Sequence, residues 1–296
     1  MQEPSIVSTR SSPPTDRVLD VLDFLAGRPG ERFGLSDLAR NLRMSKPTCL
    51  GIVNALTARG YLVREPHGLT YGLGPALMAA GRAAQEGFAV SHVARPHLEA
   101  LSERYGAACT ASAVVGDQIM VLERAGPAQG TARVGQHYPF APPVGLMYVL
   151  WDRDEALERW LAKRPTLPLH LDRPHLRTVV QQCRRRGYLV ESLTPTGLRL
   201  HTLMAGVAAY DLPPRVRDLI DEMASNLGER VLLDADLSAR RKHPVNLIAA
   251  PTYDADGRQE LVLALHVGDS VTGAEINRRA TALVAAADAV TAGVGG

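Results

Sequence analysis

The sequence has few cysteines and no long apolar run, and each shortage excludes a class of protein. Its three cysteines, Cys49, Cys109 and Cys183, lie at least 60 residues apart and form no C-x-x-C pair. A cysteine-rich zinc module is thereby excluded, and a reducing compartment is favoured. No apolar stretch approaches the roughly 18 to 20 residues that a membrane-spanning helix needs. We therefore expect a cytoplasmic protein with no membrane partner.

The net charge is also small, although the charges are unevenly distributed. Lysine and arginine number 33 and aspartate and glutamate 31, a formal excess of +2 that neither favours nor excludes a nucleic-acid partner. Between residues 28 and 64, however, seven basic residues stand against two acidic ones, a local excess of +5. Such clustering is the electrostatic footprint expected of a DNA-binding segment.

The common catalytic motifs are missing as well. The sequence contains no G-x-S-x-G elbow, no H-E-x-x-H and no Walker sequence. A dinucleotide fingerprint would need glycine where Leu77 stands. The pairs His92 and His97, and His170 and His175, are each five residues apart, a poor spacing for two metal ligands on one helical face. We therefore expect no cofactor, no metal site and no catalytic residue.

The length and composition are those of an ordinary globular protein, and the sequence divides into two parts. Its 296 residues are enough for two domains, with 46% hydrophobic and 22% charged residues. Residues 1–15 carry no apolar signal core and predict a disordered tail. Beyond residue 15, the apolar residues first recur with the period of a helix and later alternate with polar residues, as in strands.

The first part predicts three helices. Apolar residues indicate a helix over 16–26, and Ser36 is placed to cap a second helix over 37–42. Ser45 is placed to cap a third helix, with Pro47 in its first turn, where the missing N–H would have no intrahelical acceptor anyway. Helical spacing assigns to the core side Cys49, Ile52, Val53 and Leu56. It leaves on the outer side Lys46, Thr48, Leu50, Gly51 and Asn54.

A hairpin and a further helix follow. The stretches "GYLVRE" and "TYGLG" flank "PHGL" and predict two strands with Gly68 at the tip, and with Arg64 and His67 beside it. Helix, helix, turn, helix and hairpin form a winged helix-turn-helix over residues 16–74. The alanine-rich "PALMAAGRAAQEG" begins with proline and predicts a linker helix over 75–90.

The second part, residues 91–296, predicts an α+β domain with a largely antiparallel sheet. Strands are expected at "ACTASAVVG", "QIMVLERAG", "ARVGQHYPF", "YLVES", "VNLIAAPTYD" and "QELVLALHV". Helices are expected from Ser91 to Tyr105 and at "VGLMYVLW", "DEALERWLAKR", "RPHLRTVVQQCRRRG", "PPRVRDLIDEMASNLGERVLL" and the closing "TGAEINRRATALVAAADAVTAG". Thr272 and Glu275 have the spacing of a capping box before the closing helix. The stretch "GLRLHTLMAGVAAYD" fits either a strand or a buried helix.

Three stretches together resemble the IclR family of bacterial transcription regulators. They are "RVLDVLDFLA...GLSDLARNLRMSKPTCLGIVNALTARGYLVRE...YGLGPALMAAG", "VGQHYPFAPPVG", and "RRGYLVES" with "IAAPTYDADG...LVLALHVG". The likeness covers most of residues 16–296. Two features depart from the family: Leu50 and Gly51 stand where polar or basic residues are common, and Gly187 and Ala249 are 62 positions apart. About 40 residues therefore look inserted, within 193–244.

The resemblance implies a ligand-responsive, DNA-binding transcription regulator rather than an enzyme. The winged helix-turn-helix would bind a double-stranded DNA operator, and a GAF-like mixed α/β domain would bind a small-molecule effector. Effectors in this family are often small organic acids or aromatic catabolites. The protein would act as a homodimer or homotetramer, whether as a repressor or an activator. The rival interpretation is an enzyme or metabolite-binding protein that uses its helix-turn-helix for docking.

If the head binds DNA, the outer side of its third helix enters the major groove. Lys46 could contact a phosphate or a guanine edge, Thr48 and Asn54 a phosphate or adenine, and Leu50 a thymine methyl, while Gly51 permits close approach. Basic residues around the helix would anchor phosphates. The predicted DNA-contacting set is Arg43, Ser45, Lys46, Thr48, Leu50, Gly51, Asn54, Arg59, Arg64 and His67. Each of these also fits a solvated surface position.

The resemblance also implies a set of effector-binding residues, which fall in "VGQHYPFAPPVG", "RRGYLVES" and "IAAPTYDADG...LVLALHVG". The set is Tyr138, Phe140, Val144, Gly145, Glu191, Pro251, His266 and Gly268. Glu191 stands where the family often has an acidic residue. His266 could pair with a ligand carboxylate or be a satisfied buried histidine, and Phe140, Val144 and Pro251 also suit a core.

Two basic runs remain. "RRR" at 184–186 falls at a predicted helix end, where it suits a solvated cap better than a second DNA patch. "ARRKH" at 239–243 fits either a flexible loop or an additional phosphate contact.

Overall fold

A computed structural model describes residues 12–28, 30–87, 89–127, 132–166, 170–192, 228 and 230–294. The chain divides into two compact units, Met1–Gly87 and Phe88–Gly296, and each is described by itself. None of the described helices has the length and apolar character that crossing a membrane requires.

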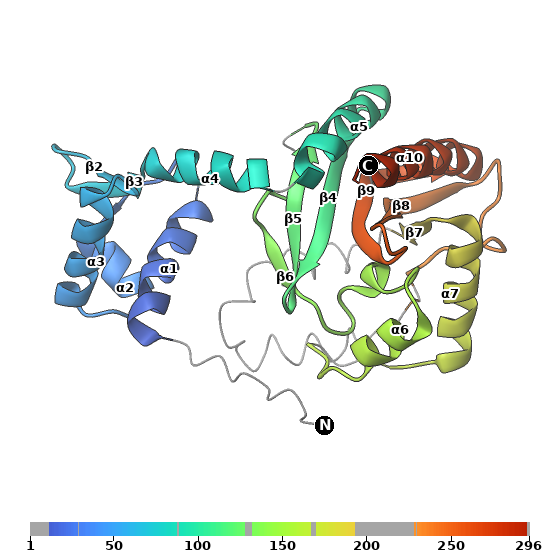
Figure 1. Cartoon of the computed structure of the whole chain (residues 1–296), viewed down its shortest axis with the longest axis horizontal. Helices are drawn as coiled ribbons and strands as arrows, with labels where there is room; N and C mark the ends of the chain where they lie inside the picture. Colours follow the sequence, from blue (N-terminus) through green and yellow to red (C-terminus); the bar gives the residue numbers. More distant parts are fainter. Residues whose placement is uncertain are drawn as a thin grey trace. The chain divides into compact units, whose positions relative to one another are not determined.

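The N-terminal unit packs three helices against a small antiparallel sheet (Figure 1). Its helices are α1 (Pro13–Ala26), α2 (Leu35–Asn41), α3 (Lys46–Ala58) and α4 (Ala76–Gly87). Its strands are β1 (Phe33–Gly34), β2 (Leu62–Arg64) and β3 (Thr70–Leu73), in the order β1-β3-β2. One apolar cluster unites α1, α2, α3 and the strands, with fully buried Val21, Leu38, Cys49 and Val53. The predicted order of helices and hairpin is confirmed.

Two details of this unit differ from the sequence prediction. Helix α1 begins at Pro13, three residues before the expected start, since proline fits a first helical turn. Helix α2 begins at Leu35 with Gly34 as its N-cap, so Ser36 is not the cap. The reason is β1, which was not expected: it pairs Gly34 with Thr70 and holds the chain extended up to the start of the helix. A two-residue strand is too short for a periodic signal.

The second unit is built on one six-stranded sheet. Its strand order is β6-β5-β4-β9-β8-β7, and all five pairings between neighbouring strands are antiparallel. The strands are β4 (Ala108–Val115), β5 (Gln118–Ala125), β6 (His137–Pro139), β7 (Leu189–Ser192), β8 (Lys242–Tyr253) and β9 (Gln259–Thr272). The predicted α+β class with an antiparallel sheet is confirmed.

Helices cover both faces of this sheet (Figure 1). On one face lie α5 (Ala89–Tyr105) and α10 (Gly273–Val294), whose apolar residues pack on those of β4, β8 and β9. On the other lie the 3-10 turn η1 (Leu146–Tyr148), α6 (Asp154–Leu161) and α7 (Arg173–Arg186). The predicted cap of α10 is confirmed, because the Glu275 amide donates to Thr272 Oγ1 over 3.3 Å.

Several predicted elements of this unit are shorter or longer than expected. "VGLMYVLW" forms only the single turn η1, and "ARVGQHYPF" contributes only β6. Strand β8 begins at Lys242, so the run "ARRKH" is a loop for three residues and strand for two. The helix expected up to Leu233 does not reach Val231, which instead bridges to Glu191. The rest of that helix, and "GLRLHTLMAGVAAYD", lie outside the described residues.

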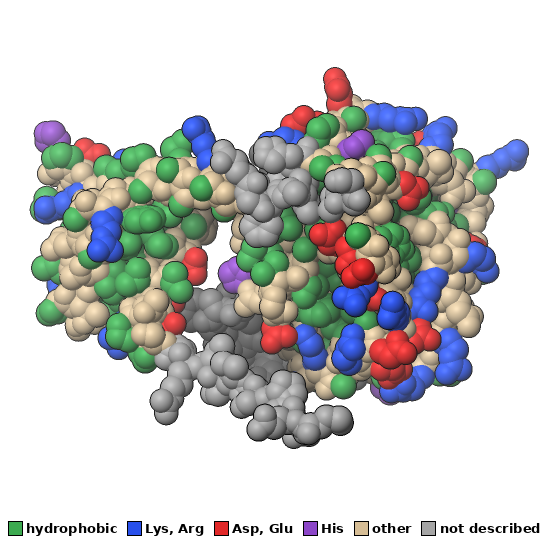
Figure 2. Space-filling model, in the orientation of Figure 1, with side chains coloured by type: hydrophobic (Ala, Val, Ile, Leu, Met, Phe, Trp, Pro, Cys, Tyr) green, Lys and Arg blue, Asp and Glu red, His purple; other side chains and the backbone are tan. Residues whose placement is uncertain are grey.

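Two of the three arginines at the end of α7 are structural rather than solvated, which corrects the sequence prediction for them, whereas the side chain of Arg185 is 68% exposed. Arg184 donates to the Leu150 and Asp152 carbonyls over 2.9 Å and 2.6 Å. Arg186 donates to the Leu232 carbonyl over 3.1 Å and pairs with Asp234, and only 7% of its side chain is exposed. Figure 2 shows basic and acidic side chains interspersed over this part of the larger unit. The pairs with Asp154 and Asp234 offset the basic charge at this helix end.

One ion pair links α5 to the sheet from within the core. Arg95 on α5 donates to Glu123 Oε2 on β5 over 2.8 Å, and the Arg124 amide donates to Glu123 Oε1 over 2.9 Å. The Glu123 side chain is only 2% exposed, whereas that of Arg95 is 47% exposed. A buried carboxylate of this kind depends on its partner, because an unpaired buried charge is costly.

We predict that Arg95→Met lowers the free energy of unfolding by about 2 kcal/mol, because Glu123 stays buried without its cation. Urea denaturation of the full chain measures the loss. Adding Glu123→Gln should recover part of it, since a neutral amide costs less to bury and can still accept from the Arg124 amide. A double variant no more stable than Arg95→Met would assign the arginine's contribution to packing of its methylenes instead.

Candidate functional site

The start of α3 is fixed by a local cap. Ser45 Oγ accepts a hydrogen bond from the Thr48 amide over 3.3 Å, and its Oγ lies 2.8 Å from Thr48 Oγ1. Pro47 sits in the first helical turn. Both sequence predictions for this helix start are confirmed. The cap closes the N-terminal turn without a bulky side chain, so the end of the helix stays open to solvent.

Among the described residues, the outer side of α3 is largely exposed. Lys46, Leu50, Gly51 and Asn54 are exposed, Leu50 by 41%, and Thr48 is half-buried. A Cβ built on Gly51 would meet nothing within 4 Å, so the fold does not require glycine there. The opposite side is buried through Cys49, Val53 and Leu56, as predicted. A side that packing leaves free is available for a partner.

The turn between α2 and α3 holds an arginine in a backbone conformation that usually takes glycine. The Met44 amide donates to the Ala39 carbonyl over 2.9 Å and the Arg43 amide to the Arg40 carbonyl over 3.3 Å, the pattern of a Schellman motif. Arg43 occupies its left-handed position with φ of 50°. Glycine is favoured at this position because a Cβ strains the left-handed backbone. The side chain is exposed and makes no ion pair or hydrogen bond with another described residue, so it is available for an external contact.

The basic residues around α3 and the wing carry uncompensated charge. Arg59 is the C-cap of α3, Arg64 ends β2, and His67 lies in the hairpin tip. No other described residue forms an ion pair or side-chain hydrogen bond with Arg43, Lys46, Arg59, Arg64 or His67, and all five are exposed. Unpaired cations that fold stability does not need are typical of phosphate contacts.

Four of the predicted effector residues lie between β6 and η1. Tyr138 is half-buried on β6, and burial raises the pKa of its phenol. Val144 bridges to Ala141 just before the turn. Gly145 has φ of 110°, and a Cβ there would stand 2.8 Å from the Phe140 ring. Only glycine therefore fits at this place in the described fold.

The other predicted effector residues belong to the late strands. Glu191 on β7 and His266 on β9 both stand opposite Leu247 of β8, so their side chains share one face of the sheet. Each has a partner: Glu191 Oε1 lies 3.7 Å from Arg230, and His266 Nε2 lies 3.1 Å from Thr110 Oγ1. Glu191 and His266 therefore lie on one face with strand β8 between them. The structure places Pro251, which is buried, farther along β8, and Gly268 beyond His266 with φ of 62°.

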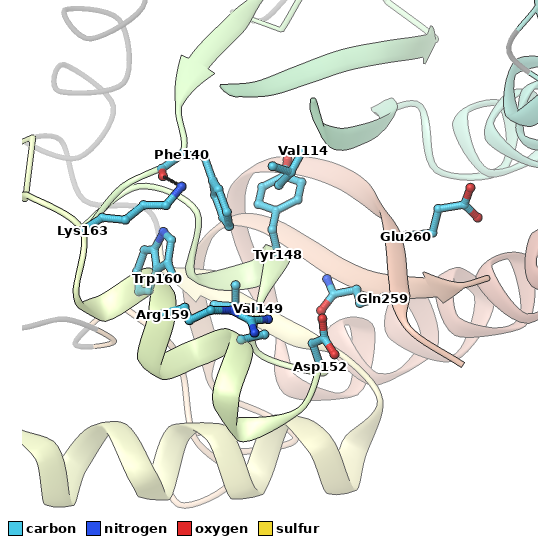
Figure 3. Close-up of a pocket in the computed structure, with 11 residues that line it drawn as sticks. Val114, Phe140, Tyr148, Val149, Asp152, Arg159, Trp160, Lys163, Gln259 and Glu260 are labelled. Atoms are coloured by element: carbon cyan, nitrogen blue, oxygen red, sulfur yellow. Dashed lines mark hydrogen bonds between the residues drawn. The ribbon is translucent and has the colours of Figure 1, made fainter. Parts of the chain in front are cut away.

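A cavity of about 380 Å³ lies elsewhere in the second unit (Figure 3). Its wall comes from the residue after β6, η1 and the loop after it, α6 and the loop after it, the end of β4 and the start of β9. The lining residues are Val114, Phe140, Tyr148, Val149, Asp152, Ala156, Arg159, Trp160, Lys163, Gln259 and Glu260. Of the predicted effector set only Phe140 is among them.

Comparison with known proteins identifies the N-terminal unit. Residues 14–66 match the family model of the IclR helix-turn-helix domain. The solved IclR transcriptional regulator of Alicyclobacillus acidocaldarius shares the fold with a TM-score of 0.63 at 19% identity, covering 96% of this chain and all of that one. The N-terminal unit is a helix-turn-helix domain of IclR type.

Two further IclR-type proteins are similar over different lengths. The HTH-type transcriptional regulator TsaQ1/TsaQ2 of Comamonas testosteroni is 26% identical over 179 residues, which are 54% of this chain and 61% of that protein. The chain thus matches about three fifths of that relative. The structure of an IclR homologue from Microbacterium hydrocarbonoxydans in complex with 4-hydroxybenzoate has a TM-score of 0.60 at 18% identity, covering 95% of this chain and 98% of that one.

The sequence prediction missed the cavity residues on and after α6. The stretch "DEALERWLAKR" reads as an ordinary amphipathic helix, and its period correctly assigns Leu157 and Trp160 to the core. The helical period of the apolar residues does not show that Arg159 and Lys163 line the same cavity as Phe140. The i, i+4 spacing of the two cations beside a tryptophan is the signal that was available.

We predict that Arg43→Gly raises the local stability of this IclR head by about 1 kcal/mol, because glycine adopts the left-handed backbone without strain. Hydrogen exchange of amides in α2 and α3 of the full chain measures the change. Arg43→Ala is the control, since it removes the guanidinium but keeps the Cβ, and should bring no gain. Faster exchange in Arg43→Gly than in the parent would show that Arg43 contributes a stabilising contact.

Proposed function

We propose that the protein is a ligand-responsive, DNA-binding transcription regulator that acts in the cytoplasm as a homodimer or homotetramer. Two heads would bind a roughly palindromic double-stranded operator, and a small molecule in the second unit would change their spacing or orientation. The observation that carries the proposal is the exposed outer side of α3, flanked by unpaired cations, in a domain of IclR helix-turn-helix type.

Within this proposal the head uses two kinds of contact. Lys46, Thr48 and Asn54 face the groove, with Leu50 and Gly51 giving an apolar and closely approaching surface. Arg43, Arg59, Arg64 and His67 hold phosphates, and Ser45 orients the helix start. Because one winged helix offers a limited contact area, two heads are needed for a specific complex. The single lysine on the outer side means that most of the affinity comes from the arginines around it.

The effector would bind on the sheet face that carries Glu191 and His266. The 4-hydroxybenzoate complex of the Microbacterium hydrocarbonoxydans homologue supports a small aromatic or organic acid as the class of effector. A ligand regulates DNA binding only if it binds one arrangement of the heads better than the other.

Binding to DNA from the protein's own promoter region tests the proposal. Affinity for a duplex of that region should exceed affinity for a scrambled duplex, and should fall steeply with salt, by a slope of about 0.9 per phosphate contact. Fluorescence anisotropy over a salt series measures both. Binding with no sequence preference and no salt slope would remove the basis for the regulator assignment.

We predict that Lys46→Ala and Arg43→Gly each weaken that binding and lower the salt slope by about 2 in a two-headed complex, one contact per head. Arg43→Gly is the sharper variant, because its fold should be more stable while its affinity falls. Arg177→Ala, which removes an exposed arginine of α7, is the control and should leave both quantities unchanged. Unchanged binding by Lys46→Ala would mean that α3 is not the helix in the groove.

A further inference from the structure

The cavity beside α6 is of the size and character of a small-molecule site. Its volume of about 380 Å³ falls at the small end of the roughly 300 to 1,000 Å³ typical of ligand pockets. Three aromatic side chains line it, Phe140, Tyr148 and Trp160, and the Phe140 and Trp160 ring centroids are 6.5 Å apart. The two rings are tilted by 33° to each other and give this wall an apolar aromatic character. The shape suits a small ligand with a planar body.

Two cations at the wall are available to a ligand. Arg159, in the last turn of α6, is exposed and has no ion pair or hydrogen bond to another described residue. Lys163 follows four residues later, with its ammonium 2.9 Å from Asp117 Oδ1, 3.1 Å from the Phe140 carbonyl and 4.3 Å from the centre of the Phe140 ring. The Asp117 side chain is 92% exposed, so its pair with Lys163 is weak and easily exchanged.

A buried donor at the same wall lacks an acceptor. Trp160 is 1% exposed, and its indole Nε1 has no hydrogen-bond partner in the described structure. Figure 3 shows this nitrogen on the side of the ring that faces Lys163 and Phe140. The other tryptophan of the unit is satisfied, because Trp151 Nε1 donates to the Cys183 carbonyl over 3.0 Å. Buried donors are nearly always paired, so the indole N–H of Trp160 indicates a missing acceptor.

The two acidic residues of the lining do not occupy this position. Asp152 Oδ1 accepts from the Arg153 amide over 2.7 Å, at the other end of α6 from Lys163. The Glu260 side chain is directed away from the other lining side chains in Figure 3. The Lys163 ammonium and the unpaired N–H thus lie together beside Phe140, and Arg159 comes from the last turn of α6. The polar amide of Gln259 is engaged by the Met147 carbonyl and the Trp151 amide.

We propose that this cavity binds a small planar carboxylate, distinct from any effector held by Glu191 and His266. The carboxylate contacts Arg159 and Lys163 and accepts from the Trp160 indole, and the planar body lies against Phe140. A guanidinium suits this role because its parallel N–H groups match the two oxygens of a carboxylate. The proposal concerns the second unit alone and holds whether or not the head binds DNA.

Benzoate is the probe, and benzamide is its neutral match of nearly the same shape. The chain has two tryptophans, and Trp151→Phe leaves only Trp160. The tryptophan fluorescence of this variant therefore reports on the cavity. We predict a saturable fluorescence change with benzoate and at least tenfold weaker binding of benzamide, because charge-assisted hydrogen bonds are lost. Calorimetry on the unmodified chain repeats the measurement in case Trp151→Phe perturbs the fold.

Arg159→Gln and Lys163→Gln should each weaken benzoate binding about tenfold or more. Arg177→Gln removes another exposed arginine, from α7, and should leave the affinity unchanged. His266→Ala should leave the Trp160 signal unchanged. The proposal would be overturned if benzamide bound as tightly as benzoate, or if benzoate showed no saturable binding at millimolar concentration. It would also be overturned if His266→Ala lost benzoate affinity while Arg159→Gln kept it. Because no DNA is present, these outcomes do not depend on the regulator test.

Discussion

Burial of the central strands on both faces is the constraint on which the second unit depends. Leu261, Leu263 and Leu265 of β9 point to one face, where α5 and α10 cover them. Val262 between them, with Leu247 and Ala249 of β8, points to the other face, where η1, α6 and α7 form a second core. An antiparallel sheet often leaves one face to water, but this one cannot, because apolar residues occupy both. The helical layer over the second face follows from that pattern, and the cavity beside α6 lies at the edge of this layer.

A different constraint governs the N-terminal unit. Its core is small, and Val21, Leu38, Cys49 and Val53 are fully buried in it. The α2–α3 turn must be short for α3 to reach that core, and the Schellman geometry at Arg43 provides the short turn. This packing buries only one side of α3. The side chains on its other side are therefore not needed for the core and stay exposed, on the same helix whose start Ser45 caps.

The sequence predicted the elements well where a local rule decides them. The Ser45 cap, Pro47 in the first turn of α3 and the cap by Thr272 follow from backbone chemistry within four residues, and the structure confirms them. Prediction was wrong where tertiary pairing decides. Gly34 replaces Ser36 as a cap because β3 holds β1, and Val231 leaves its expected helix to bridge Glu191. Likewise, period assigned Trp160 to the core but could not show that its indole would lack an acceptor. Satisfaction of a polar group depends on neighbours distant in sequence.

The position of the cavity also limits how a ligand there can act on the fold. Tyr148 lines the cavity and its hydroxyl lies 2.6 Å from Ser112 Oγ, so η1 is tied to β4 at the cavity wall. Burial raises the pKa of the Tyr148 phenol, which keeps this link neutral and its hydrogen bond intact across the physiological range. Helix α5 packs on β4 and β5 from the opposite face. A ligand that stiffens η1 against β4 therefore acts on the strand that carries α5. Any resulting change in DNA affinity must be matched by an equal change in ligand affinity when DNA binds, because the coupling free energy is shared by both events.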